Sequence, residues 1–258
     1  MNTGNAAAVS QKRIAFWLIL AGFALALIAA AAAVMSGIGY QLGWWHFRTG
    51  FALMRWAFYG GIAALILSLI GVFMPSRRNA SALAMGLIGI VLGAVVAYLP
   101  WSWKQTADAL PYIHDITTNI ENPPAFVAVA GLRGENDHPV AYDGIEVAEQ
   151  QRKAYPDLEP YVTTADAAKV FEQARATVAG MGLELVDANA GEGRIEATQT
   201  SLLYGFKDDM VIRISARPDG TQVDVRSKSR VGRSDLGQNA KRIRTFIARL
   251  KAALGETG

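Results

Sequence analysis

Three stretches in the first hundred residues are apolar almost without interruption. They cover residues 14–35, 56–74 and 80–99. A helix needs about 20 apolar residues to cross the hydrocarbon core of a bilayer, and each stretch has about that length. Lipid offers no hydrogen-bond partner to backbone groups, so a spanning segment is expected to be helical. The pattern predicts a membrane domain over residues 1–103 that contains a bundle of three transmembrane helices.

The next stretch, residues 104–159, has no steady hydrophobic period and is rich in proline, glycine and asparagine. Such a composition is typical of extended chain and turns. Apolar side chains at 126–129 and at Tyr142 offer anchors to a folded domain. We therefore expect an extended connecting segment that lies against the domain that follows it.

Residues 160–258 alternate between helical and strand patterns. A helix is expected to open at Thr163 or Thr164, with Asp166 in its first turn, and to end near Gly180. A second helix is expected from about Asp235 to Leu254, capped by Ser234 or Asp235. Between them, period-two segments separated by turn residues predict four strands, at 183–187, 194–202, 210–217 and 221–231. The prediction is an α+β fold whose soluble domain has two layers: a helix, a four-stranded antiparallel sheet and a helix, with both helices on one face.

The distribution of charge supports the membrane assignment. All 22 acidic residues lie at Asp108 or beyond. A carboxylate at the bilayer centre costs about 3 kcal/mol or more, which explains their absence from the spans. No charged residue marks an ion or proton path, so a transporter or channel is disfavoured. The first stretch is longer than the apolar core of a signal peptide, about 7–15 residues, which favours a retained helix over a cleaved one.

Orientation follows from the basic residues of the short loops. Lys12 and Arg13 precede the first stretch, and Arg77 and Arg78 lie in the short second loop; the opposite side carries three basic residues. The small excess predicts a multi-pass protein of the bacterial inner (plasma) membrane. Its N-terminus would be cytoplasmic and its C-terminal domain periplasmic, with membrane lipid as one partner.

A G-x-x-x-G pair, Gly89 and Gly93, lies in the third stretch. Small residues at this spacing allow two helices to approach closely. The pair predicts either packing within the three-helix bundle or an oligomer, and the sequence leaves both alternatives open.

The strand at 221–231 is the most informative segment for function. Alternation places Asp224, Arg226, Lys228 and Arg230 on one face and the serines 227 and 229 on the other. One interpretation is a solvated face with cross-strand ion pairs, including Glu196 and Asp224. The other is an anion-binding surface completed by backbone amides at the start of the last helix. The candidate ligand-binding residues are Arg213, Arg226, Ser227, Ser229, Arg230, Arg233, Asp235 and Asn239.

An enzyme is a weaker interpretation. Asp208 and Asp209, with Ser227 or Ser229, form a possible acidic site, because adjacent carboxylates can divide acid and base roles. Neighbouring residues of a strand point to opposite faces, however, so the geometry is poor. The His-Asp neighbours at 114–115 and 137–138 fit no standard metal motif. We expect no metal and no cofactor.

The segments 205–214, 225–237 and 239–243 resemble the bacterial domain-of-unknown-function family 1499. The resemblance covers roughly residues 122–254 and is most specific in the 226–237 block. It implies an envelope protein and no established activity. The family's usual cysteine-containing entry segment is absent, since the chain has no cysteine, and the three helices would replace its anchoring role.

Three functions follow from these patterns. The first is a membrane-anchored envelope domain that binds a partner protein, a lipid headgroup or a small anionic ligand. The second is a structural subunit of a larger membrane complex, and the third a hydrolase-like enzyme. Nucleic-acid binding is not expected, because the predicted topology places the basic C-terminal part outside the cytoplasm.

Overall fold

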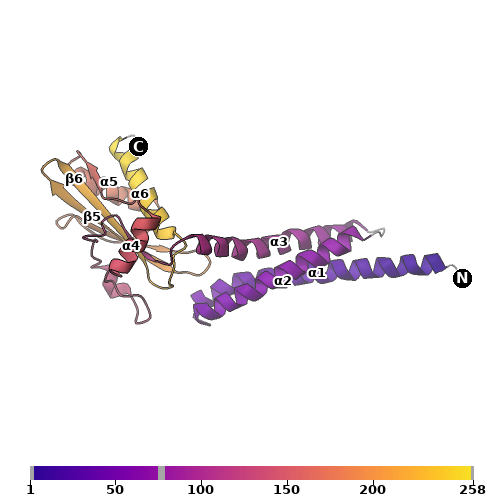
Figure 1. Cartoon of the computed structure of the whole chain (residues 1–258). Helices are drawn as coiled ribbons and strands as arrows, with labels where there is room; N and C mark the ends of the chain where they lie inside the picture. Colours follow the sequence, from indigo (N-terminus) through magenta and orange to yellow (C-terminus); the bar gives the residue numbers. More distant parts are fainter. Residues whose placement is uncertain (1–2, 75–78, 257–258) are drawn as a thin grey trace. The chain divides into compact units, whose positions relative to one another are not determined.

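The chain folds into two compact units, seen in a computed structural model that describes residues 3–74 and 79–256, with side chains from Val9 onward. The first unit contains the residues up to Gln105 together with Leu203–Gly205. The second contains Thr106–Leu202 and the chain from Phe206 onward. Helices build the first unit, and a sheet with helices builds the second (Figure 1).

The first unit contains α1 (Thr3–Gln41), α2 (Phe47–Phe73) and α3 (Ala80–Ala109). All three helices are long and apolar enough to cross a membrane, as the sequence predicts. They are longer than the apolar stretches, because the helical backbone continues into the more polar flanks. Pro100, expected to end the third helix, lies inside α3. Proline removes one backbone donor, but neighbouring groups make it tolerable in membrane helices. Pro75, Arg77 and Arg78 lie outside the described residues.

Glycines bring the three helices into close contact. Ser68 of α2 lies between Gly22 of α1 and Gly89 of α3: a Cβ at either glycine would come within 2.4 Å of the Ser68 Oγ. A Cβ at Gly93 would lie 2.8 Å from the carbonyl oxygen of Gly61. Both members of the G-x-x-x-G pair therefore pack inside the bundle. An oligomer formed through them stays a prediction.

Replacing Gly93 by valine is expected to destabilise the bundle by about 1–3 kcal/mol, because the added atoms meet backbone that cannot move away easily. The measurement is the midpoint of unfolding of the full chain in mixed micelles of increasing SDS fraction. Val91→Leu is the control, since Val91 is 63% exposed on the same helix. Equal midpoints for Gly93→Val and the wild type would contradict the close contact.

The second unit contains six strands, not the four predicted. The sheet is antiparallel in the order β1-β6-β5-β4-β3, and β2 also pairs with β6. The two additional strands have three residues each, too few to show a period of two in the sequence. In chain order the elements are β1 (Asp115–Thr117), the 3-10 helix η1 (Val129–Leu132), α4 (Ile145–Ala154), β2 (Tyr161–Thr163), α5 (Ala167–Gly180), β3 (Glu184–Asn189), β4 (Arg194–Thr200), β5 (Lys207–Arg217), β6 (Gly220–Ser229) and α6 (Gln238–Leu254).

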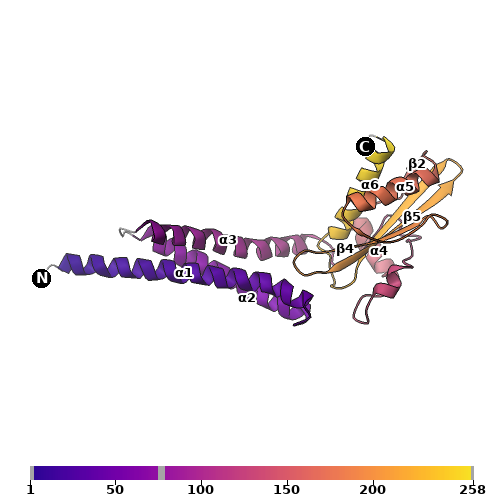
Figure 2. The ribbon, with the colours of Figure 1, turned by 180° about the vertical axis from the view of Figure 1, so that it is seen from behind.

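One face of the sheet carries α5 and α6, which lie side by side (Figures 1 and 2). The main hydrophobic core fills the space between them and the sheet. It includes Val170 and Phe171 of α5, Ile243 and Phe246 of α6, and Ile212 of β5. Residues 119–143, which we call the cover segment, lie on the other face, where Phe126 and Val129 pack on Val211.

The bounds of β3, β4 and β6 differ from the prediction by up to two residues, and three other boundaries differ by more. Thr163 belongs to β2, so α5 begins later and Asp166 caps it by accepting a hydrogen bond from the Ala168 amide (2.8 Å). The third predicted strand begins at Lys207 rather than Met210, because pairing with both neighbouring strands extends it. The last helix begins at Gln238. In each case a tertiary contact moves a boundary that local propensity leaves open.

Candidate functional site

The polar residues of β6 divide between the two faces of the sheet as the alternation predicts. Both sets are buried: Lys228 and Ser227 have no exposed surface, and Arg226 and Arg230 are 2% and 7% exposed. The interpretation of a solvated face is therefore wrong, because the cover segment excludes water from it. A buried charge needs a partner and hydrogen bonds, so the question is what holds each cation.

Asp115 of β1 neutralises the centre of this face. Arg226 donates two hydrogen bonds to its carboxylate, Nε to Oδ1 and Nη2 to Oδ2, both of 2.8 Å. The Lys228 Nζ lies 3.2 Å from Oδ2 and donates to Asp143 Oδ1 at 2.5 Å. The forked contact has the geometry of strong arginine–carboxylate recognition. Two cations and two carboxylates thus form a closed group.

Asp209 of β5 forms a second group beside the first. Arg230 donates to both of its carboxylate oxygens, with Nη2 to Oδ1 at 2.8 Å and Nε to Oδ2 at 3.0 Å. Arg133 of the cover segment donates from Nε to Oδ2 (3.0 Å), and the Thr198 hydroxyl donates to Oδ1 (2.7 Å). The Asp209 side chain has no exposed surface. Both carboxylate oxygens are therefore occupied by hydrogen bonds from within the domain.

The same cations bind the backbone of the cover segment. The carbonyl oxygens of residues 122, 124, 132, 140 and 141 accept hydrogen bonds from Arg213, Arg226, Arg230 and Lys228, at 2.7–3.2 Å. Arg213 also pairs with Asp224 at 2.7 Å. A long loop needs partners for its buried backbone groups, and the charged strand face supplies them.

Glu196 of β4 also binds the cover segment, but through a negative charge that accepts hydrogen bonds from backbone amides. Its Oε1 accepts the amides of Val127 (2.8 Å) and Ala128 (3.1 Å), and its Oε2 accepts that of Val129 (2.9 Å). Arg194 completes the pairing at 2.5 Å. The carboxylate therefore accepts hydrogen bonds from the free amides at the start of η1, where a negative charge is favourable.

A second polar network lies on the helix side of β6. Arg242 of α6 donates to the Ser227 hydroxyl (2.8 Å), to Asp208 Oδ2 (2.7 Å) and to the Asn239 side-chain oxygen. The Asn239 side-chain nitrogen donates to Ser229 Oγ at 3.1 Å. This network joins the predicted residues Asp208, Ser227, Ser229 and Asn239 to one arginine. It contains no histidine that could act as a base for either serine.

The loop at 231–237, between β6 and α6, is held in a fixed shape. Asp235 accepts the amides of Gly237 (2.9 Å) and Asn239 (2.6 Å), and so occupies the backbone donors that an anion would need at the start of α6. Burial raises the pKa of Asp235, although these hydrogen bonds oppose the shift. Gly237 adopts φ = +76°, a left-handed conformation that glycine allows at little cost.

Arg233 of this loop differs from the other candidate arginines because it is exposed. Its guanidinium carbon lies 5.5 Å from the centroid of the Tyr112 ring, and Tyr112 is itself 61% exposed. Among the described residues, no carboxylate forms an ion pair with Arg233. The pair thus presents a cation and an aromatic ring on a rigid loop.

His114 and His138 link this loop to the cover segment. Their ring centroids are 4.1 Å apart, and the His138 Nε2 lies 2.8 Å from the carbonyl oxygen of Gly232. Burial, and next the neighbouring His138, lower the pKa of His114 to about 4. Asp143, whose Oδ2 is 3.6 Å from the His114 Nδ1, opposes this shift without cancelling it. His114 is therefore neutral at pH 7.

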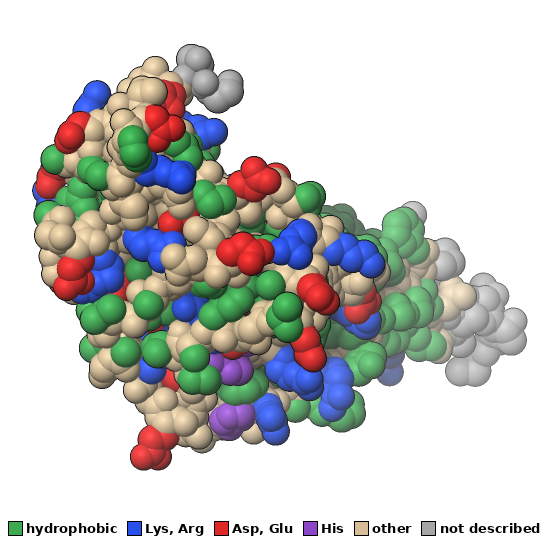
Figure 3. Space-filling view, turned by 60° about the vertical axis from the view of Figure 1, so that its left-hand side comes forward, with side chains coloured by type: hydrophobic (Ala, Val, Ile, Leu, Met, Phe, Trp, Pro, Cys, Tyr) green, Lys and Arg blue, Asp and Glu red, His purple; other side chains and the backbone are tan. Residues whose placement is uncertain are grey.

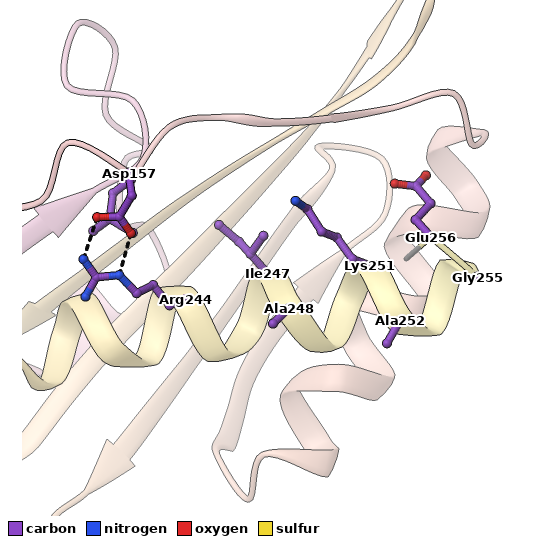
Figure 4. Close-up of a pocket in the computed structure, with 9 residues that line it drawn as sticks. Asp157, Arg244, Ile247, Ala248, Lys251, Ala252, Gly255 and Glu256 are labelled. Carbon is purple, nitrogen blue, oxygen red and sulfur yellow. Dashed lines mark hydrogen bonds and ion pairs between the residues drawn. The ribbon is translucent and has the colours of Figure 1, made fainter. Parts of the chain in front are cut away.

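An open groove of about 710 Å³ also runs along α6 (Figure 4). The Asp157–Arg244 ion pair marks one end, and Lys251 and Glu256 lie toward the other. Small and apolar side chains line the space between them, among them Ile247, Ala248 and Ala252. Acidic and basic side chains are interspersed over the face of the domain seen in Figure 3, without a large patch of one sign.

The structure separates the predicted site residues into three groups. Arg213, Arg226, Arg230 and Asp209 face the cover segment; Asp208, Ser227, Ser229 and Asn239 face α6; Arg233 and Asp235 lie in the loop. Asp208 and Asp209 pair on opposite faces with different arginines. Sequence reasoning missed Arg133, Asp143, Arg242 and Tyr112, because nothing local connects them to the strand.

These features define a class: a domain with three membrane-capable helices and an α+β unit built around buried ion pairs. Residues 115–250 match the model of the family described as "Protein of unknown function (DUF1499)". The match covers more than half of the chain, so the chain belongs to this family, as the resemblance implied. A comparison with curated proteins found no match.

Replacing Asp115 by asparagine is expected to destabilise the soluble domain by about 3–5 kcal/mol, because it leaves Arg226 and Lys228 buried beside a neutral group. The measurement is chemical denaturation of the full chain in detergent, monitored by far-UV circular dichroism.

Glu121→Gln is the matched control, since Glu121 pairs with Arg152 at the surface, where both side chains are more than half exposed. Such a pair contributes about 0–1 kcal/mol. Similar losses for the two variants would show that the buried group does not carry the fold.

Proposed function

We propose that this chain is a multi-pass protein of the bacterial inner membrane whose α+β domain lies in the periplasm and binds an envelope partner protein. The binding surface is Tyr112 together with the loop at 231–237. Three membrane-capable helices support the anchored part of this proposal. The proposed compartment and orientation rest on the small excess of basic residues in the N-terminal tail and the second loop, which would face the cytoplasm.

The observation that carries the proposal is the exposed Arg233 on a preformed loop. The buried cations are occupied by carboxylates and by the cover segment, so a small anion would have to displace an ion pair to reach them. Asp235 likewise occupies the amides at the start of α6. A rigid loop that presents its groups in one conformation loses little entropy on binding.

Magnitudes favour a protein over lipid as the ligand. One guanidinium at an anionic membrane surface contributes about 1 kcal/mol. Arginine and tyrosine are among the residues that contribute most at protein interfaces, often about 2 kcal/mol or more each when they become buried. An adjacent Arg233 and Tyr112 therefore suit a protein surface better than a bilayer. A carboxylate on the partner protein would form an ion pair with Arg233.

The test is affinity purification of the full-length chain from native membranes in mild detergent, with quantitative mass spectrometry. Arg233→Ala and Tyr112→Ala are each expected to reduce recovery of the same partner roughly 30-fold, the equivalent of about 2 kcal/mol. Arg217→Ala is the control, because Arg217 is an exposed arginine at the far end of β5.

Unchanged recovery with both variants would overturn the proposal. The same chains in nanodiscs of neutral or anionic phospholipid give a second arm. Binding to anionic lipid that Arg233→Ala abolishes, without a protein partner, would replace the protein ligand by a lipid headgroup.

The proposed orientation has its own test, which uses the absence of cysteine from the chain. A single cysteine at the exposed Asp219, in the turn before β6, is expected to react with a membrane-impermeant maleimide in spheroplasts. Ser10→Cys, near the start of α1, is expected to react only after lysis. The reverse labelling pattern would place the domain in the cytoplasm.

A further inference from the structure

Two histidines join three separate segments of the soluble domain. His114 directly precedes β1, and His138 belongs to the cover segment. The amide of His138 donates to the carbonyl oxygen of Arg230 (2.7 Å), and its Nε2 bonds to that of Gly232 (2.8 Å). The two imidazoles, in contact at an interplanar angle of 53°, therefore hold the end of the cover segment against the loop at 231–237.

A proton on His114 would add a positive charge to a buried cluster that already holds Lys228, with Asp143 Oδ2 at 3.6 Å from the His114 Nδ1 as the nearby carboxylate. The rings are 4.1 Å apart, and the buried His114 Nε2 has no hydrogen-bond partner among the described residues. Lys228, a cation without exposed surface, faces His114 from β6. Arg133 of the cover segment donates to the His138 carbonyl oxygen (2.7 Å).

We propose that the His114–His138 pair is a pH-sensitive latch, which opens in acid and releases the loop at 231–237 together with the adjoining end of the cover segment. The latch would regulate the binding surface named above, so its biological role rests on the proposed function. The opening of the latch in acid does not depend on that function. The step is reversible protonation of imidazole: an N–H bond forms on the ring as hydronium gives up a proton and becomes water.

The sign of the effect follows from the groups that face His114. Burial, His138 and Lys228 disfavour its charged form, whereas Asp143 and Asp115 favour it, and the balance lowers its pKa to about 4. In an open state the ring would titrate near the ordinary value of 6.5. Between these values the open state binds a proton that the closed state does not, so opening becomes easier as the pH falls from about 6.5 toward 4. Below about pH 4 both states are protonated, and the gain stops.

Asp235 acts in the opposite direction. Burial raises its pKa above the ordinary value of 3.8 in the closed state, so the closed state takes up this proton more readily than an open state with an exposed carboxyl group. Through Asp235, acid therefore favours the closed loop and subtracts from the effect of His114. A useful experiment must therefore separate the histidine contribution from that of this carboxyl group.

The experiment is amide hydrogen exchange of the full-length chain in phosphatidylcholine nanodiscs at about pH 7 and about pH 4.5, corrected for the intrinsic exchange rate. Peptides that contain residues 138–143 and 231–237 are expected to open roughly 100-fold more in acid, as the difference between the two pKa values implies. Peptides from the centres of β4 and β5 are expected to keep their protection.

His114→Gln keeps a polar, neutral side chain and is expected to remove most of the acid effect, whereas Asp235→Asn is expected to retain or increase it. The proposal fails if acid leaves the wild-type peptides unchanged, or if His114→Gln retains the full response. Histidine NMR of the wild-type chain gives a check without substitution: a His114 ring that titrates near pH 6.5 in the folded state also overturns it.

Failure of the latch and failure of the proposed function are distinguishable. Hydrogen exchange needs no partner, and partner recovery with Arg233→Ala is measured at neutral pH, where the latch is closed.

Discussion

The contact between Arg226 and Asp115 is the interaction on which the soluble domain depends. Burying an ion costs several kcal/mol, which is recovered only when a partner charge and hydrogen bonds are well placed. Here the forked pair supplies the charge, and the carbonyl oxygens of Pro124 and Val140 accept the remaining donors. Because Arg226 is satisfied in this way, a strand with three charged residues can lie inside the protein rather than at its surface.

The same contact explains how a long irregular segment is ordered. Loops of this length without regular structure are uncommon in compact domains, since their backbone groups lack partners. The cover segment obtains partners from side chains: cations bind its carbonyl oxygens and Glu196 binds its amides. Asp115 and Asp143, from the earlier part of the chain, neutralise Arg226 and Lys228 of β6. The exposed Arg233 lies outside this network, in the 231–237 loop.

The sequence predicted those features that repeat over many residues. Twenty apolar positions in a row have few interpretations other than a membrane helix, and the alternation at 221–231 placed Arg226 and Ser227 on opposite faces. It could not connect Arg226 with Asp115, because 111 positions separate them and neither lies in a local pattern that names the other. Asp115 instead drew attention as a neighbour of His114. The short strands β1 and β2 were not predicted for a related reason. Each has three residues that are held by pairing with β6, too few to show a hydrophobic period in the sequence.

The arrangement of Glu196 over η1 has a consequence for the order of assembly. The cover segment is synthesised before β4, β5 and β6, yet it takes its hydrogen bonds from their side chains. The cover segment has no strand pairing of its own that could form before these strands are synthesised. During synthesis, residues 119–143 must therefore stay unstructured until the sheet has closed behind them, with contacts of high sequence separation forming last. The segment that completes the domain is thus synthesised early and ordered late.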